Sequence, residues 1–295
     1  MTRENVKGHM AAIIANIFFG LNMTISKEIF ASSWMTPFGL TITRVSSSLV
    51  IFWAISFLIV KEKPVLRDLL VIGAGGFLGI AVGQIAFTSA LRLISPVTMS
   101  LITSLSPFIV LLLSALFSIE SISVKKAIGV IIGISGAALV ILQSGIDRTS
   151  SFSFIGIGLA LLSVTSYAAH LIVIRKIAKK YSPITMMKWM YLWVLLFLSP
   201  FGIPELPQQR LFSSEATIAP FLLLGYTIVF ASILGFFLMP VALKRIKATT
   251  VSMYNNFQPL TASTAAIIIG QDVFSWDKPL ALILIITGVF LVTRR

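Results

Sequence analysis

The chain has 295 residues, of which 57% are hydrophobic and 11% are charged, and its mean hydropathy is +0.99. A water-soluble domain carries about 25% charged residues, so this composition excludes an ordinary soluble enzyme or nucleic-acid-binding domain. The net charge of +13 is explained more simply by basic cytoplasmic loops of a membrane protein than by nucleic acid. Without cysteine there are no disulfides, thiolate metal ligands or cysteine nucleophile.

Apolar stretches follow one another along the whole chain. A helix that spans a bilayer needs about 20 mostly apolar residues. The sequence predicts an all-α membrane protein with ten transmembrane helices, at residues 9–30, 37–60, 69–91, 95–117, 124–143, 154–175, 184–202, 217–241, 248–269 and 277–293. The first stretch follows Arg3 and Lys7 and could pass for a signal peptide, but no small-residue cleavage site follows it. We expect it to be the first helix.

Basic residues alternate between the connections in a way that sets the orientation. With a cytoplasmic N-terminus, sixteen Lys and Arg residues fall in cytoplasmic segments and four fall in outside loops. The positive-inside rule therefore predicts a multi-pass protein of the cell membrane with both termini in the cytoplasm.

The two halves of the sequence resemble each other at a constant offset of 152 residues. The matches include three glycine pairs (73/225, 83/235 and 136/288), Thr98/Thr250 and Pro107/Pro259. A looser offset of 148 pairs Asn22 with His170. We expect two units, 1–147 and 148–295, each with five spans. Because five is odd, the second unit enters the membrane from the opposite side, as in the inverted repeats of many secondary transporters.

These features together resemble a known family. Arg44 in the second span, an Ala-Leu-Arg/Lys run before spans four and nine, Pro107 and Pro259, and the pair Glu120/Asp272 are similar to the drug/metabolite transporter superfamily. The nearest branch is the EamA-type permeases, which include exporters of amino acids and other metabolites. The resemblance implies two inverted five-helix repeats around a central cavity, without a nucleotide or other cofactor.

Polar residues within spans are costly unless they face the bundle interior or a wet cavity. Helical spacing puts Ser100, Thr103, Ser104 and Pro107 on one stripe. The same register in the second unit gives Ser252, Asn255, Asn256 and Pro259, with Tyr254 and Gln258 nearby. We expect substrate contacts from Ser104, Tyr254, Asn255, Asn256 and Gln258, and hinges at Pro107 and Pro259. The alternative for the serines is simple helix packing.

A second group of candidates lies on other spans. Ser163, Ser166, Tyr167 and His170 share one face. Tyr167, His170, Asn22, Gln84 and Arg44 are predicted substrate-binding residues, although His170 could be structural and Arg44 could extend towards the interface. Lys27 and Lys188 lie nearer helix ends and are interpreted as anchors that reach the interface.

The charges within the spans indicate the class of substrate. No Asp or Glu lies at the centre of any predicted span, which disfavours a pump for hydrophobic cations. The intramembrane cations suit a carboxylate. We therefore expect a secondary transporter of small zwitterionic or anionic metabolites, of amino-acid type and acting in export, by alternating access. Proton coupling through His170 and facilitated diffusion both remain open.

Other functions fit the sequence less well. A lipid-linked carrier or flippase, or a broad-range drug exporter of the same superfamily, is the alternative. The sequence predicts no catalytic group, no metal site and no cofactor. The expected partners are a small-molecule substrate and the lipid bilayer, not nucleic acid. The oligomeric state is left open, and a monomer is compatible with the sequence.

Overall fold

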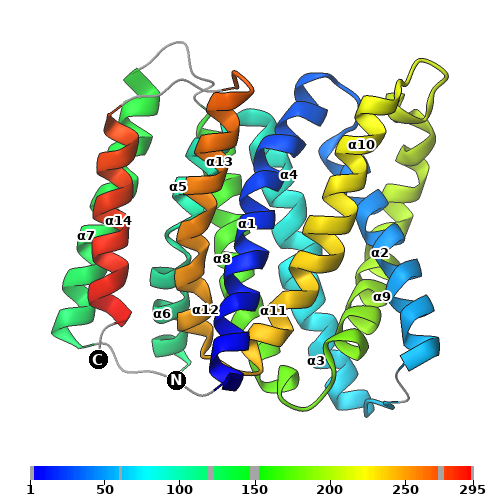
Figure 1. Ribbon diagram of the computed structural model, residues 1–295, viewed down its shortest axis with the longest axis horizontal. Helices are drawn as coiled ribbons and strands as arrows, with labels where there is room; N and C mark the ends of the chain where they lie inside the picture. Colours follow the sequence, from blue (N-terminus) through cyan, green and yellow to red (C-terminus); the bar gives the residue numbers. More distant parts are fainter. Residues whose placement is uncertain (1–2, 60–61, 118–122, 147–152, 272–275, 294–295) are drawn as a thin grey trace.

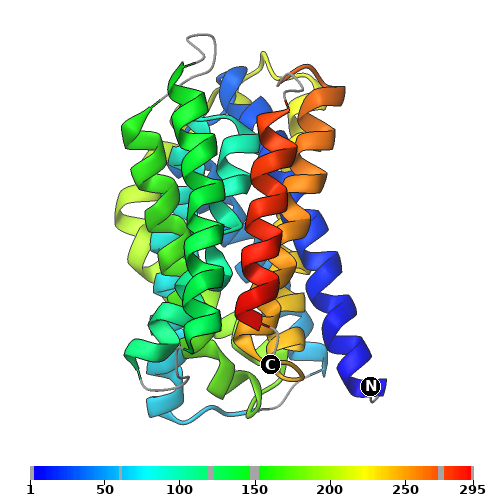
Figure 2. The same cartoon turned by 90° about the vertical axis from the view of Figure 1, so that its left-hand side faces the viewer.

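A computed structural model describes residues 3–59, 62–117, 123–146, 153–271 and 276–293, and all regular structure among them is helical. The helices stand side by side, as Figures 1 and 2 show. The first half contains α1 (Arg3–Ala31), α2 (Pro37–Ile59), α3 (Leu66–Gly76), η1 (Phe77–Val82), α4 (Gly83–Leu93), α5 (Pro96–Thr103), α6 (Ser106–Leu116) and α7 (Val124–Ile146). The start of α1 and the end of α14 lie at the same end of the bundle (Figure 1).

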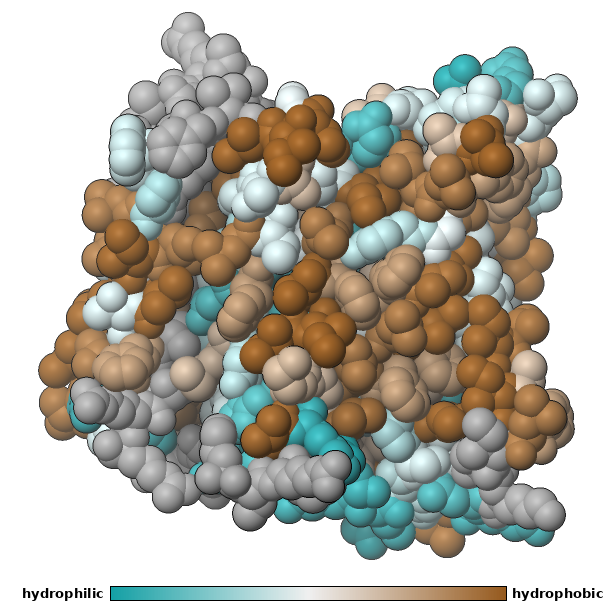
Figure 3. Space-filling model, in the orientation of Figure 1, coloured by the Kyte–Doolittle hydropathy of each residue, from teal (hydrophilic) through white to brown (hydrophobic). Residues whose placement is uncertain are grey.

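The second half continues with α8 (Phe154–Ala178), α9 (Pro183–Gly202), η2 (Ile203–Gln208), η3 (Arg210–Phe212), α10 (Ile218–Tyr226), η4 (Thr227–Gly235), α11 (Phe236–Leu243), α12 (Ala248–Met253), η5 (Tyr254–Asn256), α13 (Phe257–Ile268) and α14 (Asp277–Thr293). Seven helical segments within the described residues are long and apolar enough to cross a membrane. Apolar side chains cover the middle of the face in Figure 3, while hydrophilic ones gather mainly towards its ends.

Several helices begin where the sequence supplies a cap followed by proline. The Ser95 hydroxyl accepts a hydrogen bond from the Thr98 backbone N–H at 3.1 Å, and Pro96 opens α5. Ser182 and Pro183 open α9 in the same way. A serine at the cap satisfies an otherwise unpaired N–H. Proline fits the first turn because its missing N–H has no helical partner there.

The structure interrupts two predicted spans of each half. Residues 69–91 and 217–241 contain the π-helical stretches η1 and η4, and residues 95–117 and 248–269 break at 104–105 and at η5. The π-helical interruptions correspond at the same offset: adding 152 to η1 (Phe77–Val82) gives residues 229–234, which lie within η4. Pro107 and Pro259 lie in the first turns of α6 and α13, so neither proline removes a hydrogen bond from the middle of a helix.

The first helix of each half packs against the other half. Helix α1 contacts η4, α11 and α13, whereas α8 contacts α3, η1, α4 and α6. Two further pairs, α2 with α9 and α7 with α14, join corresponding elements. At Gly20 of α1, an added Cβ would overlap the Thr261 hydroxyl and approach the Gln258 carbonyl oxygen to 2.9 Å. Glycine therefore allows α1 and α13 to approach closely.

Polar contacts join the two halves at each end of the bundle. At the end that holds the start of α1, Asp68 accepts hydrogen bonds from the Lys180 ammonium and, at 2.6 Å, from the Tyr181 hydroxyl. At the other end, Gln209 Oε1 accepts a hydrogen bond from the Thr36 backbone N–H at 2.7 Å. The predicted repeat partners Glu120 and Asp272 lie outside the described residues.

Candidate functional site

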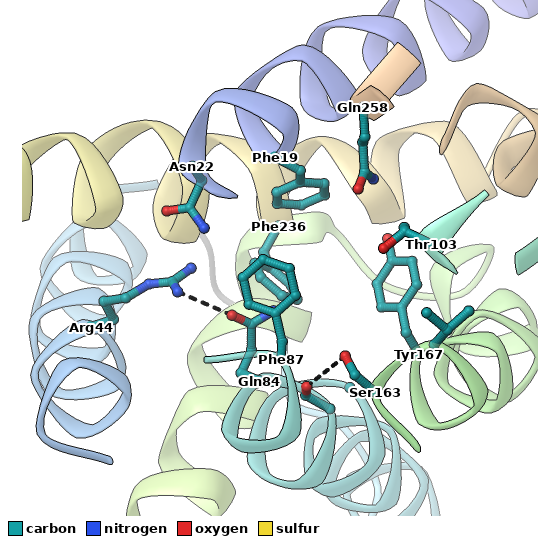
Figure 4. A pocket seen from close by; sticks show the side chains of 13 residues that line it. Phe19, Asn22, Arg44, Gln84, Phe87, Thr103, Ser163, Tyr167, Phe236 and Gln258 are labelled. Carbon is teal, nitrogen blue, oxygen red and sulfur yellow. Dashed lines mark hydrogen bonds between the residues drawn. The ribbon is translucent and has the colours of Figure 1, made fainter. Parts of the chain in front are cut away.

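A cavity lies inside the bundle, between helices of both halves. Its empty volume is about 530 Å³, including open space at its mouth. Its polar lining residues are Asn22, Arg44, Gln84, Thr103, Ser163, Tyr167 and Gln258. Three phenylalanines, Phe19, Phe87 and Phe236, also line it. Figure 4 shows these rings between Arg44 on one side and Tyr167 and Gln258 on the other.

Arg44 is buried and connects the two halves. Its Nε donates a hydrogen bond to the Ser232 hydroxyl at 2.7 Å, and its Nη1 donates to Gln84 Oε1 at 3.0 Å. Gln84 belongs to α4 and Ser232 to η4, so the guanidinium connects an element of the first half with one of the second half. No carboxylate of the described residues forms an ion pair with Arg44. A guanidinium has more N–H groups than these two bonds use.

The π-helical stretch η4 fixes the position of Ser232. The Ser232 hydroxyl donates to the Thr227 carbonyl oxygen at 3.0 Å, and the Ser232 carbonyl oxygen accepts from the Tyr191 hydroxyl at 2.7 Å. π-Helical turns alter the backbone hydrogen-bond pattern and are frequent at functional sites. The sequence analysis missed Ser232, although a serine within an otherwise apolar span is a signal that could have identified it.

The polar face predicted on residues 154–175 packs against η1 and its neighbours. Ser163 donates to the Gly83 carbonyl oxygen at 2.9 Å, Ser166 to the Leu78 carbonyl oxygen at 2.6 Å, and His170 Nδ1 to the Gly75 carbonyl oxygen at 2.7 Å. These side chains satisfy backbone oxygens at the helix interruption. Within the described residues the α8 polar face therefore supports the fold, and Ser163 also lines the cavity.

Tyr167 and His170 have different surroundings. Their rings stack with centroids 5.7 Å apart. Tyr167 lines the cavity and its buried hydroxyl has no partner among the described residues. His170 is 1% exposed and is absent from the lining. Its predicted substrate or proton role stays a prediction.

Two buried carboxamides connect α1 with α13. Gln258 Nε2 donates to Asn16 Oδ1 at 2.6 Å, and Asn16 Nδ2 donates to the Ala12 carbonyl oxygen at 2.8 Å. Asn22 Oδ1 accepts a hydrogen bond from the Ser26 hydroxyl at 3.5 Å. Asn22 of the first half and Gln258 of the second half both line the cavity.

The remaining predicted residues lie away from the cavity lining. Ser104 is buried at the break between α5 and α6 and donates to the Ser100 carbonyl oxygen at 3.2 Å. Tyr254 contacts His9 Nδ1 through its hydroxyl at 2.6 Å. Asn255 is fully buried, and neither of its amide atoms has a partner among the described residues; Asn256 Oδ1 is also unpaired there. The cavity thus brings together Asn22, Arg44, Gln84, Tyr167 and Gln258, but not Ser104, His170, Tyr254, Asn255 or Asn256.

The interpretation of Lys188 as an interfacial anchor is wrong. Its side chain is 8% exposed and donates to the Ser56 hydroxyl at 2.7 Å. The ammonium lies 5.3 Å from the Trp53 ring centroid and 5.9 Å from that of Trp189. Aromatic faces attract a cation, so Lys188 is held between α2 and α9. Lys27, in contrast, reaches the helix end and donates to the Arg92 and Ile94 carbonyl oxygens.

Comparison with known proteins identifies the family. The sequence profile of the EamA-like transporter family matches residues 6–142 and 154–294. The chain belongs to this family. The resemblance to the drug/metabolite transporter superfamily is therefore confirmed, and the protein is a multi-pass membrane transporter.

Relatives cover nearly the whole chain. An "Uncharacterized transporter" of Archaeoglobus fulgidus is 24% identical over 278 residues, which are 94% of this chain and 95% of the relative. The "Uncharacterized transporter YetK" of Bacillus subtilis is 20% identical over 95% of this chain and 83% of the relative. A crystal structure with 18% identity matches with a TM-score of 0.67, covering 98% of this chain and 96% of the other, so the two share a fold.

Proposed function

We propose that this EamA-family protein is a secondary transporter of small zwitterionic or anionic metabolites, of amino-acid type, and that it exports them by alternating access. The observation that carries this proposal is the buried Arg44 at the cavity. Its guanidinium has two neutral partners and no ion pair among the described residues. A buried cation without a counter-charge is costly, and a substrate carboxylate would supply that charge when it binds.

The scaffold supports a mechanism in which two inverted repeats exchange conformations. The interruptions in the two halves correspond in sequence, and α1 and α8 each pack against the opposite half. Arg44 contacts one element from each half, α4 and η4. A ligand on Arg44 would therefore affect the contacts of both groups of helices. Alternating access requires such a site at the interface of the repeats.

In the proposed orientation the protein lies in the cell membrane and both of its termini face the cytoplasm. The start of α1 and the end of α14 share one end of the bundle (Figure 1). Lys63, Arg67, Lys179 and Lys180 lie in or beside the segments that the Asp68 contacts join at that end. An excess of basic residues on one side supports a cytoplasmic location. The proposed partners are the small-molecule substrate and the surrounding lipid.

The test is counterflow in proteoliposomes with labelled amino acids and organic acids, comparing Arg44→Met with Lys188→Met. Both variants remove a buried cation from a span, but only Arg44 lines the cavity. We expect Arg44→Met to reduce exchange at least tenfold, equivalent to about 1.4 kcal/mol of lost binding. Lys188→Met should retain exchange. Normal exchange in folded Arg44→Met would refute the assignment of the carboxylate site.

A further inference from the structure

The cavity has fewer available hydrogen-bond acceptors than its polar residues suggest. The carbonyl oxygens of Gly75, Leu78 and Gly83, at and beside the π-helical η1, accept hydrogen bonds from α8 side chains. On the opposite half, the Thr227 and Ser232 carbonyl oxygens accept from the hydroxyls of Ser232 and Tyr191. These five carbonyl oxygens therefore already accept one hydrogen bond each from a side chain of the protein. A substrate ammonium would have to share them with these side chains.

Several N–H and O–H donors of the lining side chains have no partner within the described residues. Gln84 Oε1 accepts from Arg44 and Asn22 Oδ1 accepts from Ser26. Within the described residues, neither amide nitrogen of Asn22 and Gln84 has a hydrogen-bond partner, and neither does the Tyr167 hydroxyl. Arg44 retains N–H groups beyond its two bonds. Among these carboxamide oxygens, Gln258 Oε1 accepts no hydrogen bond within the described residues.

The formal charge of the described lining is positive. Arg44 is a lining cation, and the described lining contains no Asp or Glu. An ammonium in this cavity would lose its water without gaining a carboxylate partner, and it would be repelled by the guanidinium. Moving an unpaired charge out of water is strongly unfavourable. A carboxylate, in contrast, gains a charge-assisted hydrogen bond.

We infer that the cavity selects an organic monoanion with an apolar body over the corresponding zwitterion. The carboxylate binds Arg44, and the body packs against Phe19, Phe87 and Phe236. This inference rests on the proposed function and chooses between the two charge classes that it includes. The rings of Phe19 and Phe236 pack edge to face, with centroids 5.4 Å apart. They form an apolar surface beside the cationic side of the cavity (Figure 4).

The experiment uses three ligands with one carbon skeleton and different charge. Binding of 3-phenylpropanoate, phenylalanine and 2-phenylethylamine to the purified full chain is measured by titration calorimetry and by thermal shift. We expect 3-phenylpropanoate to bind at least tenfold more tightly than phenylalanine, and the amine not to bind. Acetate, which has no apolar body, should bind at least tenfold more weakly than 3-phenylpropanoate. Equal binding of acetate would overturn the role of the phenylalanines.

Arg44→Met and Lys188→Met separate the possible failures. If Arg44→Met loses 3-phenylpropanoate binding and Lys188→Met keeps it, both proposals are supported. If phenylalanine binds the unmodified protein as tightly as the anion, and Arg44→Met loses both, the inferred selectivity is wrong while the proposed carboxylate site stands. If Arg44→Met retains the anion with unchanged affinity, both proposals are overturned.

Discussion

Gly79→Ala tests the packing that positions the cavity wall. Gly79 lies in η1, and a Cβ there would be 2.5 Å from His170 Nδ1 and 2.6 Å from His170 Cγ. His170 cannot remain in place, because these separations are about 1 Å shorter than ordinary van der Waals contact. Its movement would break the 2.7 Å hydrogen bond to the Gly75 carbonyl oxygen. It would also disturb the stacked Tyr167 ring, which lines the cavity.

The expected loss of stability has two main contributions. Overpacking costs about 1–3 kcal/mol, and an unsatisfied buried polar group costs about 1–3 kcal/mol. Replacing glycine by alanine in a helix recovers roughly 1 kcal/mol. The net destabilisation is therefore about 1–5 kcal/mol. At roughly 2–4 °C per kcal/mol for large domains, this lowers the melting temperature by about 2–20 °C.

Gly158→Ala is the matched control, because Gly158 lies in α8 and an added Cβ there has no neighbour within 4 Å. Melting of both variants is followed in the same detergent by intrinsic fluorescence. We expect Gly158→Ala to melt at or slightly above the unmodified protein. In a His170→Ala background, Gly79→Ala should have little further effect, because the clashing ring is gone. The reasoning fails if Gly79→Ala and Gly158→Ala have equal stability.

Three further variants test individual contacts. Asp68→Asn should lower the melting temperature at neutral pH, since Lys180 loses an ionic partner. The hydrogen bond to Asp68 raises the pKa of Lys180, so the difference from the unmodified protein should shrink as the pH in a melting series rises through that raised pKa; a constant difference would contradict this. Asn255→Leu should keep or raise the melting temperature in the same assay, because it removes two unpaired buried amide atoms; a large decrease would reveal a missed partner. Ser232→Ala should weaken 3-phenylpropanoate binding at least threefold in calorimetry by removing a fixed acceptor for Arg44; unchanged affinity would contradict a positioning role.

Much of the site could be predicted because each polar residue within an apolar span is, by itself, evidence of an interior position. Arg44, Asn22, Gln84, Tyr167 and Gln258 were predicted as substrate contacts, and the structure brings all five to one cavity. The rule behind the prediction is the cost of a polar group facing lipid. This rule identifies residues that face the interior, but it does not separate a cavity from a packed interface.

That limit explains why other predicted residues lie elsewhere. Ser104 donates to its own helix, and His170 satisfies a backbone oxygen of η1. Both side chains are buried where they donate hydrogen bonds to backbone oxygens, and neither lines the cavity. Lys188 misled because its distance from the helix end suggested that it could reach the interface, whereas two tryptophan faces and Ser56 hold it inside. Such pairings join helices far apart in sequence, and helical periodicity does not determine them.

The helix interruptions were only partly predictable. Proline marked the breaks before α6 and α13, because proline favours the first helical turn. The π-helical stretches η1 and η4 carry no comparable residue, although they occupy corresponding positions in the two halves. Their stability depends on the hydroxyl groups of other helices, such as Ser166 on the Leu78 carbonyl oxygen. The sequence of one span alone therefore does not predict where its helix is interrupted.

The same dependence determines what the cavity can bind. By residue type alone, Ser163 and Gln84 offer oxygen atoms to a substrate ammonium, and the freed backbone carbonyls offer more. In the folded chain the Gly83 carbonyl oxygen already accepts from Ser163, and Gln84 Oε1 already accepts from Arg44. These contacts engage oxygens at the cavity, while the Arg44 charge has no carboxylate partner among the described residues. Charge selectivity follows from these internal hydrogen bonds together with Arg44, so it cannot be obtained from the composition of the lining alone.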